Sequence, residues 1–566
     1  MTDAPLTFLL LLVLVWPLLL AAAASFRATR PLALRLTPWA ALPALAAVAI
    51  PNTELHLSGV MLGGALALDA IGRVFLLSMS VLWLAAGLVA RQSLGASDSG
   101  RFAVLLLLAM AGGLGMALVG DVLWFYAAST LAGYALYGVL MQAGDGTSRQ
   151  AGRVFVVLLV ASDLLVFEVL LMLAHSAAGT DFTAFRQAFL TAESRALILG
   201  LLVAGFGVKI GIVGVHFWLA PVFSTAPAPL RPALIAYILG AGLLGGLRLL
   251  PVGDLKAPDV GDILLWLTWA TLVYAWLVGT LQSQRGSILA YAAMATGGLW
   301  LAVLSMLLQS PGLWEAAAKP LAIMLVQSGF ALAALLLMTA GGTGEPPHRH
   351  SYFVLGLRWL AAVLLATAPI GIAGVIAGGA AVLPIEFAMA VIAFLAAGSL
   401  MHRDDGPNVA SSARVALGET EGAGAWSPSG PRAAAGLSGA AVLALAYQLS
   451  GAPLSGTVVE ALIALIFLLL GALNARLLVA RLPSLPPGDV VVCIGYAVAA
   501  LRQGSRRLME MDLGRWPDTV RSLTQGLSSG AARLRIGRWE QKLTRWPAAL
   551  VLMVLLGLFV TWLACA

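Results

Sequence analysis

The stretch KIGIVGVHFWLAPVFSTAPAPLRPALIAYILGAGLLGGLRLLP, residues 209–251, decides the fold of this chain. Lys209 stands in an apolar run, His216 follows seven residues later, and four prolines come next: Pro221, Pro227, Pro229 and Pro232. A lysine in the middle of a membrane span costs about 3 kcal/mol, so it normally has a function or a partner. Proline interrupts a helix, and at membrane depth the freed backbone groups must face protein or a water-filled cavity. A charge beside a broken helix is typical of the ion or substrate path of a transporter.

The composition is that of a membrane protein with many spans. Of the 566 residues 60% are apolar and only 10% are charged, and the mean hydropathy is +0.95. Because a bilayer offers the backbone no hydrogen bonds, the spans must be helices or a closed barrel, and runs of about 20 apolar residues without alternation exclude the barrel. The first run, Leu6 to Ala24, lacks a basic segment before it and a small-residue cleavage site, so we expect a retained span rather than a signal peptide.

The sequence predicts no catalytic, cofactor-binding or metal-binding residues. Its two cysteines, Cys493 and Cys565, are far apart and form no CxxC pair, which argues against iron–sulfur clusters, c-type haem and thiolate zinc. The net charge of +7 suits basic cytoplasmic loops and does not indicate nucleic-acid binding. Any redox chemistry is therefore expected to belong to partner subunits.

Hydropathy predicts about 16 spans, each close to the ~20 residues that cross the hydrocarbon. The second is expected at 32–50, and the seventh, which contains Lys209, at 196–220. The expected parts of the chain are 1–100 with spans 1–3, 101–250 with spans 4–8, 251–400 with spans 9–13, a polar cytoplasmic loop at 401–433, 434–481 with spans 14–15, a basic amphipathic interfacial segment at 482–546, and a last span at 547–566.

Arginines predict the orientation. Loops after odd-numbered spans are the basic ones, as at Arg27, Arg91 and Arg149. By the positive-inside rule these loops are cytoplasmic, so the N-terminus is expected outside and the basic segment 482–546 inside, in a bacterial-type inner membrane. That segment interleaves arginines with Leu, Met, Val and Trp, which suits either an anchor on the lipid surface or a lateral brace against neighbouring subunits.

The order Lys, seven residues to His, then Trp-Leu with a proline two residues on, A-P and a later Arg resembles the proton-conducting transporter family, which reads W-L-P and A-P at these places. That family is shared by the antiporter-like subunits L, M and N of NADH-quinone oxidoreductase and by the large subunits of multisubunit cation/proton antiporters. The matching residues are Lys209, His216, Trp218, Leu219, Pro221, Ala226, Pro227 and Arg248. Residues 66–88 with Asp69, 121–140 and 286–305 resemble further family segments, so the resemblance covers most of 60–400.

The resemblance implies an all-α polytopic membrane protein of about 16 transmembrane helices. Two inverted five-helix repeats, each with a broken helix, would occupy 101–250 and 251–400. In the family a glutamate on the fifth span pairs with the lysine, and this position falls on Thr130. The family's second lysine, on the eighth span, falls on Gly240. The eleventh-span His and Lys positions fall near Leu325, Gly329 and Ala333, so the chain keeps Lys209 but lacks most of the charged axis.

Five residues are expected to form an ion path: Lys209, His216, Asp163, Glu168 and Glu386. Asp163 and Glu168 are five residues apart, about 140° around a helix, so they cannot both face Lys209. Asp163, which stands where some subunit-L-like relatives have an acidic residue, is the preferred partner. Lys209 is either a proton relay or half of a static ion pair. His216 either caps carbonyls at the break or shuttles protons, and Glu386 lies either at the far end of the path or at an interface.

Two classes of function fit this pattern. The first is an ion-translocating (H⁺ or Na⁺) subunit of a larger NADH-quinone oxidoreductase-like or cation/proton antiporter complex, without a redox site of its own. The second is a non-conducting scaffold or coupling subunit of such a complex. A membrane subunit of an inorganic-carbon uptake system is a variant of the first. In each case the expected partners are other membrane subunits, the lipid bilayer and H⁺ or Na⁺.

Overall fold

The computed structural model describes residues 4–56, 64–93, 99–142, 146–282, 284–339, 348–370, 372, 382–401, 429–449 and 464–473. The chain forms two units, Met1–Pro487 and Gly488–Ala566, and every described residue belongs to the first unit. The predicted interfacial segment 482–546, the last span 547–566 and most of the polar loop 401–433 lie outside the described residues.

Within the described residues, ten helices are long and apolar enough to cross a membrane. Helices suit this role because every backbone donor and acceptor is paired within the segment. The long helices of the first half are α1 (Ala4–Ser25), α4 (Ala70–Ser93), α5 (Ser99–Leu118), α6 (Val122–Gln142) and α7 (Gly146–Ala174). The polytopic helical architecture is thereby confirmed, whereas the total of about 16 spans and the inverted repeats stay predictions.

The segment predicted as a span at 32–50 is divided into three short pieces. They are α2 (Arg30–Leu36), the 3₁₀ helix η1 (Thr37–Ala41) and α3 (Leu42–Ala47). Each piece has a proline in its first turn: Pro31, Pro38 and Pro43. Because proline has no N–H to donate, it starts a helix easily and interrupts one that would continue.

A β-hairpin, which an all-α prediction does not contain, follows these pieces. Strands β1 (Thr53–His56) and β2 (Ala65–Leu68) pair antiparallel, with Thr53 opposite Leu68. The hairpin binds the connection between α5 and α6, since the Ala65 carbonyl accepts from Gly120 N at 2.8 Å and Ala65 N–H donates to Asp121 Oδ2 at 3.1 Å. Burial raises the pKa of the Asp121 carboxyl, while backbone N–H donors partly offset that rise.

The stretch that contains Lys209 is a helix broken twice. Its pieces are α9 (Arg195–Ile210), α10 (Leu219–Thr225), α11 (Leu230–Tyr237), the π-helix η2 (Ile238–Leu244) and α12 (Gly245–Leu249). The first break lies at Gly211 rather than at Pro221, because Gly211 and Gly214 take the left-handed φ values +83° and +87°. Pro221 stands in the first turn of α10, where no N–H is needed, and Pro227 follows the end of α10 at the second break.

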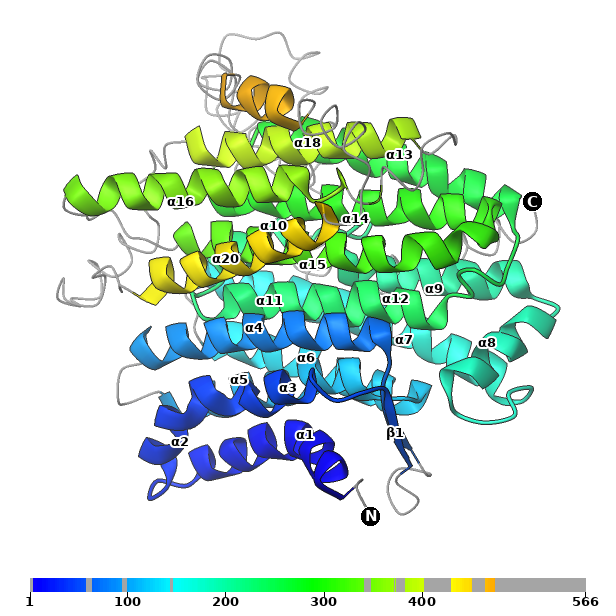
Figure 1. Ribbon diagram of the computed structural model, residues 1–566, viewed down its shortest axis with the longest axis horizontal. Coiled ribbons are helices and arrows are strands. Elements are labelled where there is room, and N and C mark those ends of the chain that lie inside the picture. Colours follow the sequence, from blue (N-terminus) through cyan, green and yellow to red (C-terminus); the bar gives the residue numbers. More distant parts are fainter. Residues whose placement is uncertain are drawn as a thin grey trace, which may run out of the picture. The chain divides into compact units, whose positions relative to one another are not determined.

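The second half surrounds two helices that are almost wholly buried, α14 (Arg285–Gln309) and α15 (Trp314–Met338). Figure 1 shows them in the interior, where α14 packs against α18 and α15 packs against α16, α4 and α11. Around them lie α13 (Pro258–Thr280), α16 (His348–Thr367), α18 (Val382–Met401) and α20 (Ser429–Leu449). A short 3₁₀ helix, η3 (Pro311–Leu313), precedes α15, and α8 (Phe182–Thr191) lies between α7 and α9 in the chain.

The glycines at the first break give a testable prediction. An alanine Cβ at Gly211 would lie 2.9 Å from Leu219 Cδ2, whereas at Gly214 it would meet nothing within 4 Å. A left-handed conformation costs an L-residue about 1–2 kcal/mol, so Gly211→Ala and Gly214→Ala should both lower the apparent melting temperature in detergent, Gly211→Ala more strongly. Gly312→Ala, which has free space and no positive φ, is the matched control. Equal melting temperatures for all three variants would contradict the assigned break.

Candidate functional site

Lys209 lies at the end of a helix inside the protein. It is the penultimate residue of α9, and only 4% of its surface is exposed. The last carbonyls of a helix have a partial negative charge, which favours an ammonium group there. Several of these carbonyls are occupied: Gly207 O accepts from Gly211 N at 2.8 Å, and Val208 O accepts from Trp218 Nε1 at 2.8 Å. The break therefore places the partly negative C-terminal end of α9 beside Lys209, and hydrogen bonds still satisfy carbonyl groups of that end.

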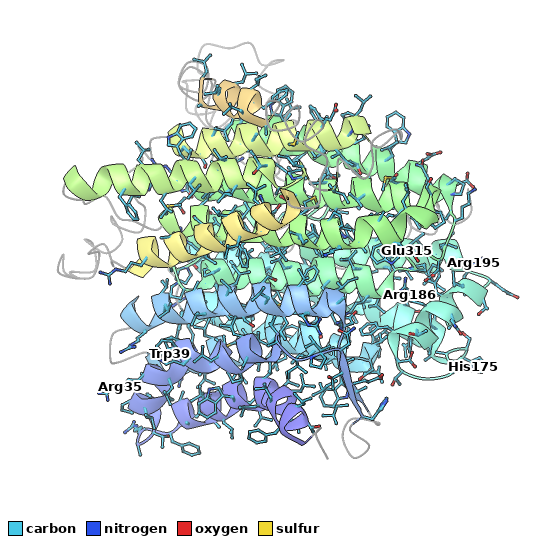
Figure 2. All side chains as sticks on the ribbon, viewed as in Figure 1. Arg35, Trp39, His175, Arg186, Arg195 and Glu315 are labelled. Carbon is cyan, nitrogen blue, oxygen red and sulfur yellow. The ribbon has the colours of Figure 1, made fainter. Side chains whose placement is uncertain are left out.

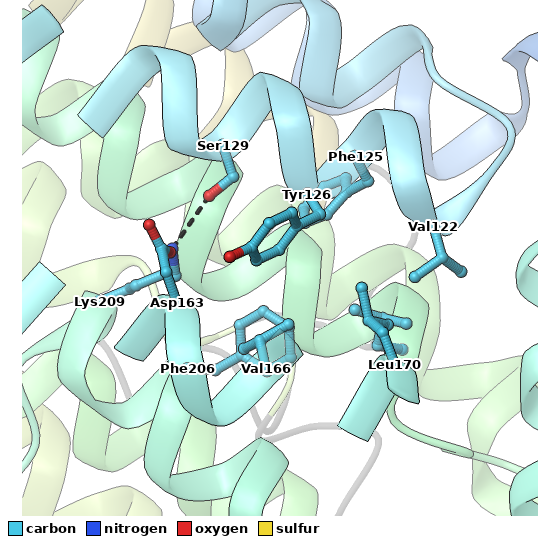
Figure 3. A pocket seen from close by; sticks show the side chains of 10 residues that line it. Val122, Phe125, Tyr126, Ser129, Asp163, Val166, Leu170, Phe206 and Lys209 are labelled. Carbon is cyan, nitrogen blue, oxygen red and sulfur yellow. Dashed lines mark hydrogen bonds and ion pairs between the residues drawn. The ribbon is translucent and has the colours of Figure 1, made fainter. Parts of the chain in front are cut away.

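Three side chains from three other helices surround the Lys209 ammonium. Lys209 Nζ donates to Asp163 Oδ1 at 2.6 Å, to Ser129 Oγ at 3.0 Å and to Tyr237 OH at 3.4 Å. Asp163 is 3% exposed, so both charges of this ion pair are buried. Figure 3 shows Asp163 and Lys209 on facing helices, with Ser129 reaching them from α6. An ammonium has three N–H donors, and these three oxygens satisfy them all.

The packing of α7 on α9 selects Asp163 as the partner. Ser162 Oγ donates to Gly205 O at 2.7 Å, and a Cβ at Gly205 would lie 2.8 Å from Val166 Cγ2. The missing side chain at Gly205 thus allows the two helices to approach closely beside Asp163. Glu168, on another face of α7, is exposed. As the spacing of the two acids predicts, only one of them faces Lys209.

The residue of α6 that contacts Lys209 is Ser129, one position before Thr130. In the resemblance drawn from the sequence, Thr130 occupies the place of the family's glutamate. The structure instead has a hydroxyl on α6 and the carboxylate on α7. The charge pair with Lys209 is therefore present, but its negative member is contributed by a different helix.

A small cavity lies beside the pair. Its volume is about 10 Å³, which is about enough to hold one water molecule. Figure 3 shows its lining. The residues that line it are Val122, Phe125, Tyr126, Ser129, Asp163, Val166, Leu170, Phe206, Lys209 and Leu249. Because Val122 begins α6 and Leu249 ends α12, the cavity extends from the pair toward that end of the helices.

Aromatic rings and an arginine lie at this end. Phe125, which lines the cavity, contacts Phe182 of α8 edge to face with ring centroids 6.0 Å apart. The Arg248 guanidinium lies 5.2 Å from the Phe182 ring centroid and donates to Asp69 Oδ1 at 3.3 Å. Arg248 also donates to Val119 O at 2.5 Å and to Ala117 O at 3.1 Å, which caps the end of α5. These contacts fix α12 and α8 where the cavity ends.

His216 lies within the first break, among aromatic residues of the second half. It is 3% exposed, its ring centroid is 4.8 Å from that of Tyr274 on α13, and it is 6.3 Å from that of Tyr291 on α14. Glu386 is the fifth residue of α18 and is half-buried. The predicted ion-path residues are thus distributed: Asp163 and Lys209 lie together, His216 adjoins the second half, and Glu386 is on a helix that packs against α13, α14 and α16.

Apolar side chains fill the space around Gly240 and Gly329, two of the altered family positions. A Cβ at Gly240 would lie 2.6 Å from Met79 Cε and 2.8 Å from Met116 Cε, and one at Gly329 would lie 2.7 Å from Leu239 Cδ1. Ala333 is fully buried. In the part of the chain that the structure describes, no three His, Cys, Asp or Glu side chains lie close enough together to hold a metal ion.

Two residues of the site could not be identified from the sequence. Ser129 and Tyr237 look like ordinary polar residues within spans, and their place beside Lys209 depends on how α6 and α11 pack. The sequence contains only a weak indication of their role: Ser129 lies in 121–140 and Tyr237 in 209–251, two segments that resemble the family.

Comparison with known proteins finds a family similar to the middle of this chain. Residues 119–345 match the family described as NADH:quinone oxidoreductase/Mrp antiporter, TM. The chain is 29% identical over 205 residues to NADH-quinone oxidoreductase subunit N of Desulfitobacterium hafniense, which covers 35% of this chain and 41% of that protein. It is 24% identical over 198 residues to hydrogenase-4 component B of Escherichia coli, covering 35% and 28%. The chain thus spans less than half the length of these two curated relatives.

A solved structure shares the fold. A chain of the Mrp complex from Dietzia sp. DQ12-45-1b superposes with a TM-score of 0.63 at 18% identity, over 94% of this chain and 63% of that one. Over residues 119–345 the chain is thus similar to the NADH:quinone oxidoreductase/Mrp antiporter family of membrane subunits, and it shares the fold of a chain of an Mrp complex.

Proposed function

We propose that this membrane subunit translocates protons and that the Asp163–Lys209 pair is the relay in its first half. The observation that supports this proposal is the pair itself: two opposite charges, 2.6 Å apart and almost fully buried, at the negative end of a broken helix. A buried charge is expensive in a membrane and is normally retained for a function. At 2.6 Å the donor and acceptor are close enough for a proton to pass directly between them.

The chemistry of the cluster favours H⁺ over Na⁺. A sodium ion requires several oxygen ligands, and the oxygens available here are those of Asp163, Ser129 and Tyr237. The Lys209 ammonium already occupies the position that these oxygens surround, and it would repel a second cation. A proton requires only a chain of donors and acceptors, which the carboxylate, the amine and the two hydroxyls provide.

The cavity beside the pair suggests how protons reach it. It has room for about one water molecule and extends toward the end of the membrane region where α8 lies. Phe125, which lines the cavity, packs edge to face against Phe182, so a continuous water path past Phe125 would require these rings to separate. This route would connect the pair to the side that the arginine distribution predicts to be outside, opposite the basic loops.

A second candidate function is a non-conducting scaffold. Methionine and leucine side chains fill the space around Gly240 and Gly329, where the family places charged residues. In that case Asp163 and Lys209 form a static ion pair that only holds α7 against α9. Both functions suit a subunit of a larger complex, which is what the names of the relatives imply for those proteins. We propose companion membrane subunits and a bacterial inner-membrane location for this chain as well.

The first test measures proton flux. In membrane vesicles that contain the chain with its companion subunits, Lys209→Met and Asp163→Asn should each reduce proton uptake at least tenfold, because removing one partner interrupts the donor–acceptor chain. Uptake is followed with a pH-gradient dye. Glu168→Gln, which removes an exposed carboxylate five residues from Asp163 on the same helix, is the matched control and should retain uptake. Normal uptake by Lys209→Met would refute the relay.

The second test separates a relay from a static pair through stability. Removing one member of a buried ion pair leaves the other charge unpaired and costs about 3–5 kcal/mol, whereas removing both costs much less. Lys209→Met and Asp163→Asn should therefore lower the apparent melting temperature, and the double variant should recover most of it. A recovered double variant without proton uptake supports the relay. A recovered double variant with normal uptake supports the scaffold.

The third test moves the carboxylate to α6. Ser129 Oγ is 3.0 Å from Lys209 Nζ, so an aspartate at this position can pair with the same lysine. Asp163→Ser alone should lose uptake, and Ser129→Asp/Asp163→Ser should regain a substantial part of it, because the charge pair is restored with the same composition. A folded double variant as inactive as Asp163→Ser would show that an ion pair with Lys209 is not sufficient for proton uptake. The carboxylate would then have to be on α7.

A further inference from the structure

A second cavity lies far along the chain from Lys209, where α2, η1, α4 and α5 meet. Its volume is about 260 Å³, and it is lined by Leu34, Arg35, Thr37, Ala90, Arg91, Ala103 and Leu106. Arg35 stands in the last turn of α2 and Arg91 in the last turn of α4, so both arginines lie at helix ends. We call it the N-terminal cavity.

The described segments that form the N-terminal cavity carry positive charge and no carboxylate. Residues 4–50, 70–93 and 99–118 contain no aspartate or glutamate, and Asp98, in the connection between α4 and α5, is outside the described residues. Arg35 and Arg91 are both exposed, and no hydrogen bond or ion pair joins either of them to a described carboxylate. Arg30, close by, is different: it donates to Ala24 O at 3.1 Å and to Ser25 O at 3.5 Å, so backbone carbonyls satisfy it.

Large apolar side chains are exposed beside the N-terminal cavity. Leu32 is 60% exposed, Trp39 is 43% exposed and Leu42 is 43% exposed. Figure 2 labels Arg35 and Trp39 at one end of the helices and His175, Arg186 and Arg195 at the other end. Tryptophan beside arginine at the end of membrane helices is the arrangement found at the boundary between hydrocarbon and headgroups. The cavity therefore lies at headgroup depth, with apolar surface extending from it.

We propose that the N-terminal cavity binds the phosphate headgroup of an anionic phospholipid, with the acyl chains over Leu32, Trp39 and Leu42. Guanidinium groups bind phosphate oxygens through paired N–H donors, and basic pockets between membrane helices bind anionic headgroups. The Thr37 hydroxyl already donates to Ala33 O at 2.9 Å, so the two arginines supply the donors. A zwitterionic lipid would bring its own cation toward two arginines, which disfavours it.

The apolar walls distinguish a lipid from a soluble phosphate. Leu34, Ala90, Ala103 and Leu106 form the remainder of the lining. Free phosphate gains nothing from such walls, whereas a phospholipid buries its glycerol and first methylenes against them. The site is independent of the proposed proton relay, because it shares no residue with the Asp163–Lys209 cluster.

The test is lipid binding by the full chain in detergent, measured by native mass spectrometry with equimolar phosphatidylglycerol and phosphatidylcholine. Wild type should bind one phosphatidylglycerol in preference to phosphatidylcholine. Arg35→Gln/Arg91→Gln should weaken this binding about 25-fold, since each arginine near an anionic lipid contributes about a factor of five. Arg27→Gln/Arg101→Gln removes the same charge from exposed arginines outside the lining and should bind like wild type.

Three outcomes would overturn the proposal. The first is equal retention of the two lipids by wild type. The second is equal weakening by both double variants, which would indicate general surface charge. The third is displacement of phosphatidylglycerol by a large excess of inorganic phosphate, which would identify a soluble anion as the ligand. Retention of phosphatidylglycerol in excess phosphate, with loss only in Arg35→Gln/Arg91→Gln, supports the lipid site. Unchanged melting of that variant shows that the loss is not unfolding.

Discussion

The ion pair between Lys209 and Asp163 constrains the surrounding structure more than any other contact. Two charges buried within a membrane protein are tolerable only if each satisfies the other and their remaining hydrogen bonds are made. Here this requires α9 to end next to Lys209, α7 to approach at Gly205, and α6 and α11 to supply hydroxyls. Four helices are thus positioned by one pair, and mainly apolar side chains complete the lining of the adjacent cavity.

The break that creates this site also has to satisfy its own backbone. A helix that ends within the hydrocarbon region leaves carbonyl groups that water cannot reach. Gly211 and Gly214 turn the chain, and Trp218 returns its indole N–H to Val208 O. The W-L-A-P segment, residues 218–221, thus belongs to the same structural arrangement as the lysine. Trp218 closes the helix end, and α10 begins directly after it at Leu219.

Hydropathy predicted the helical membrane architecture. Helix geometry predicted that Asp163 and Glu168 cannot both face Lys209, and the family resemblance, not geometry, favoured Asp163. The local backbone conformation was harder to predict from the sequence. Prolines, among them Pro221 and Pro227, were the expected breakers, yet the first break lies at Gly211. It could not be predicted because nothing in the sequence marks which of the 61 glycines have a positive φ. Ser129 was missed because hydroxyls within helices commonly bond to their own backbone four residues earlier, as Thr268 does to Leu264 O and Thr296 to Ala292 O.

The filled space around Gly240 limits which residues can stand at this position. Met79 and Met116 come from two separate helices, and both of their terminal methyl groups would have to move before a longer side chain could occupy position 240. A lysine placed there would also bring an unpaired charge into an apolar contact. A second buried cation at position 240 would therefore require a carboxylate on a neighbouring helix as well, so that one substitution alone would be destabilising.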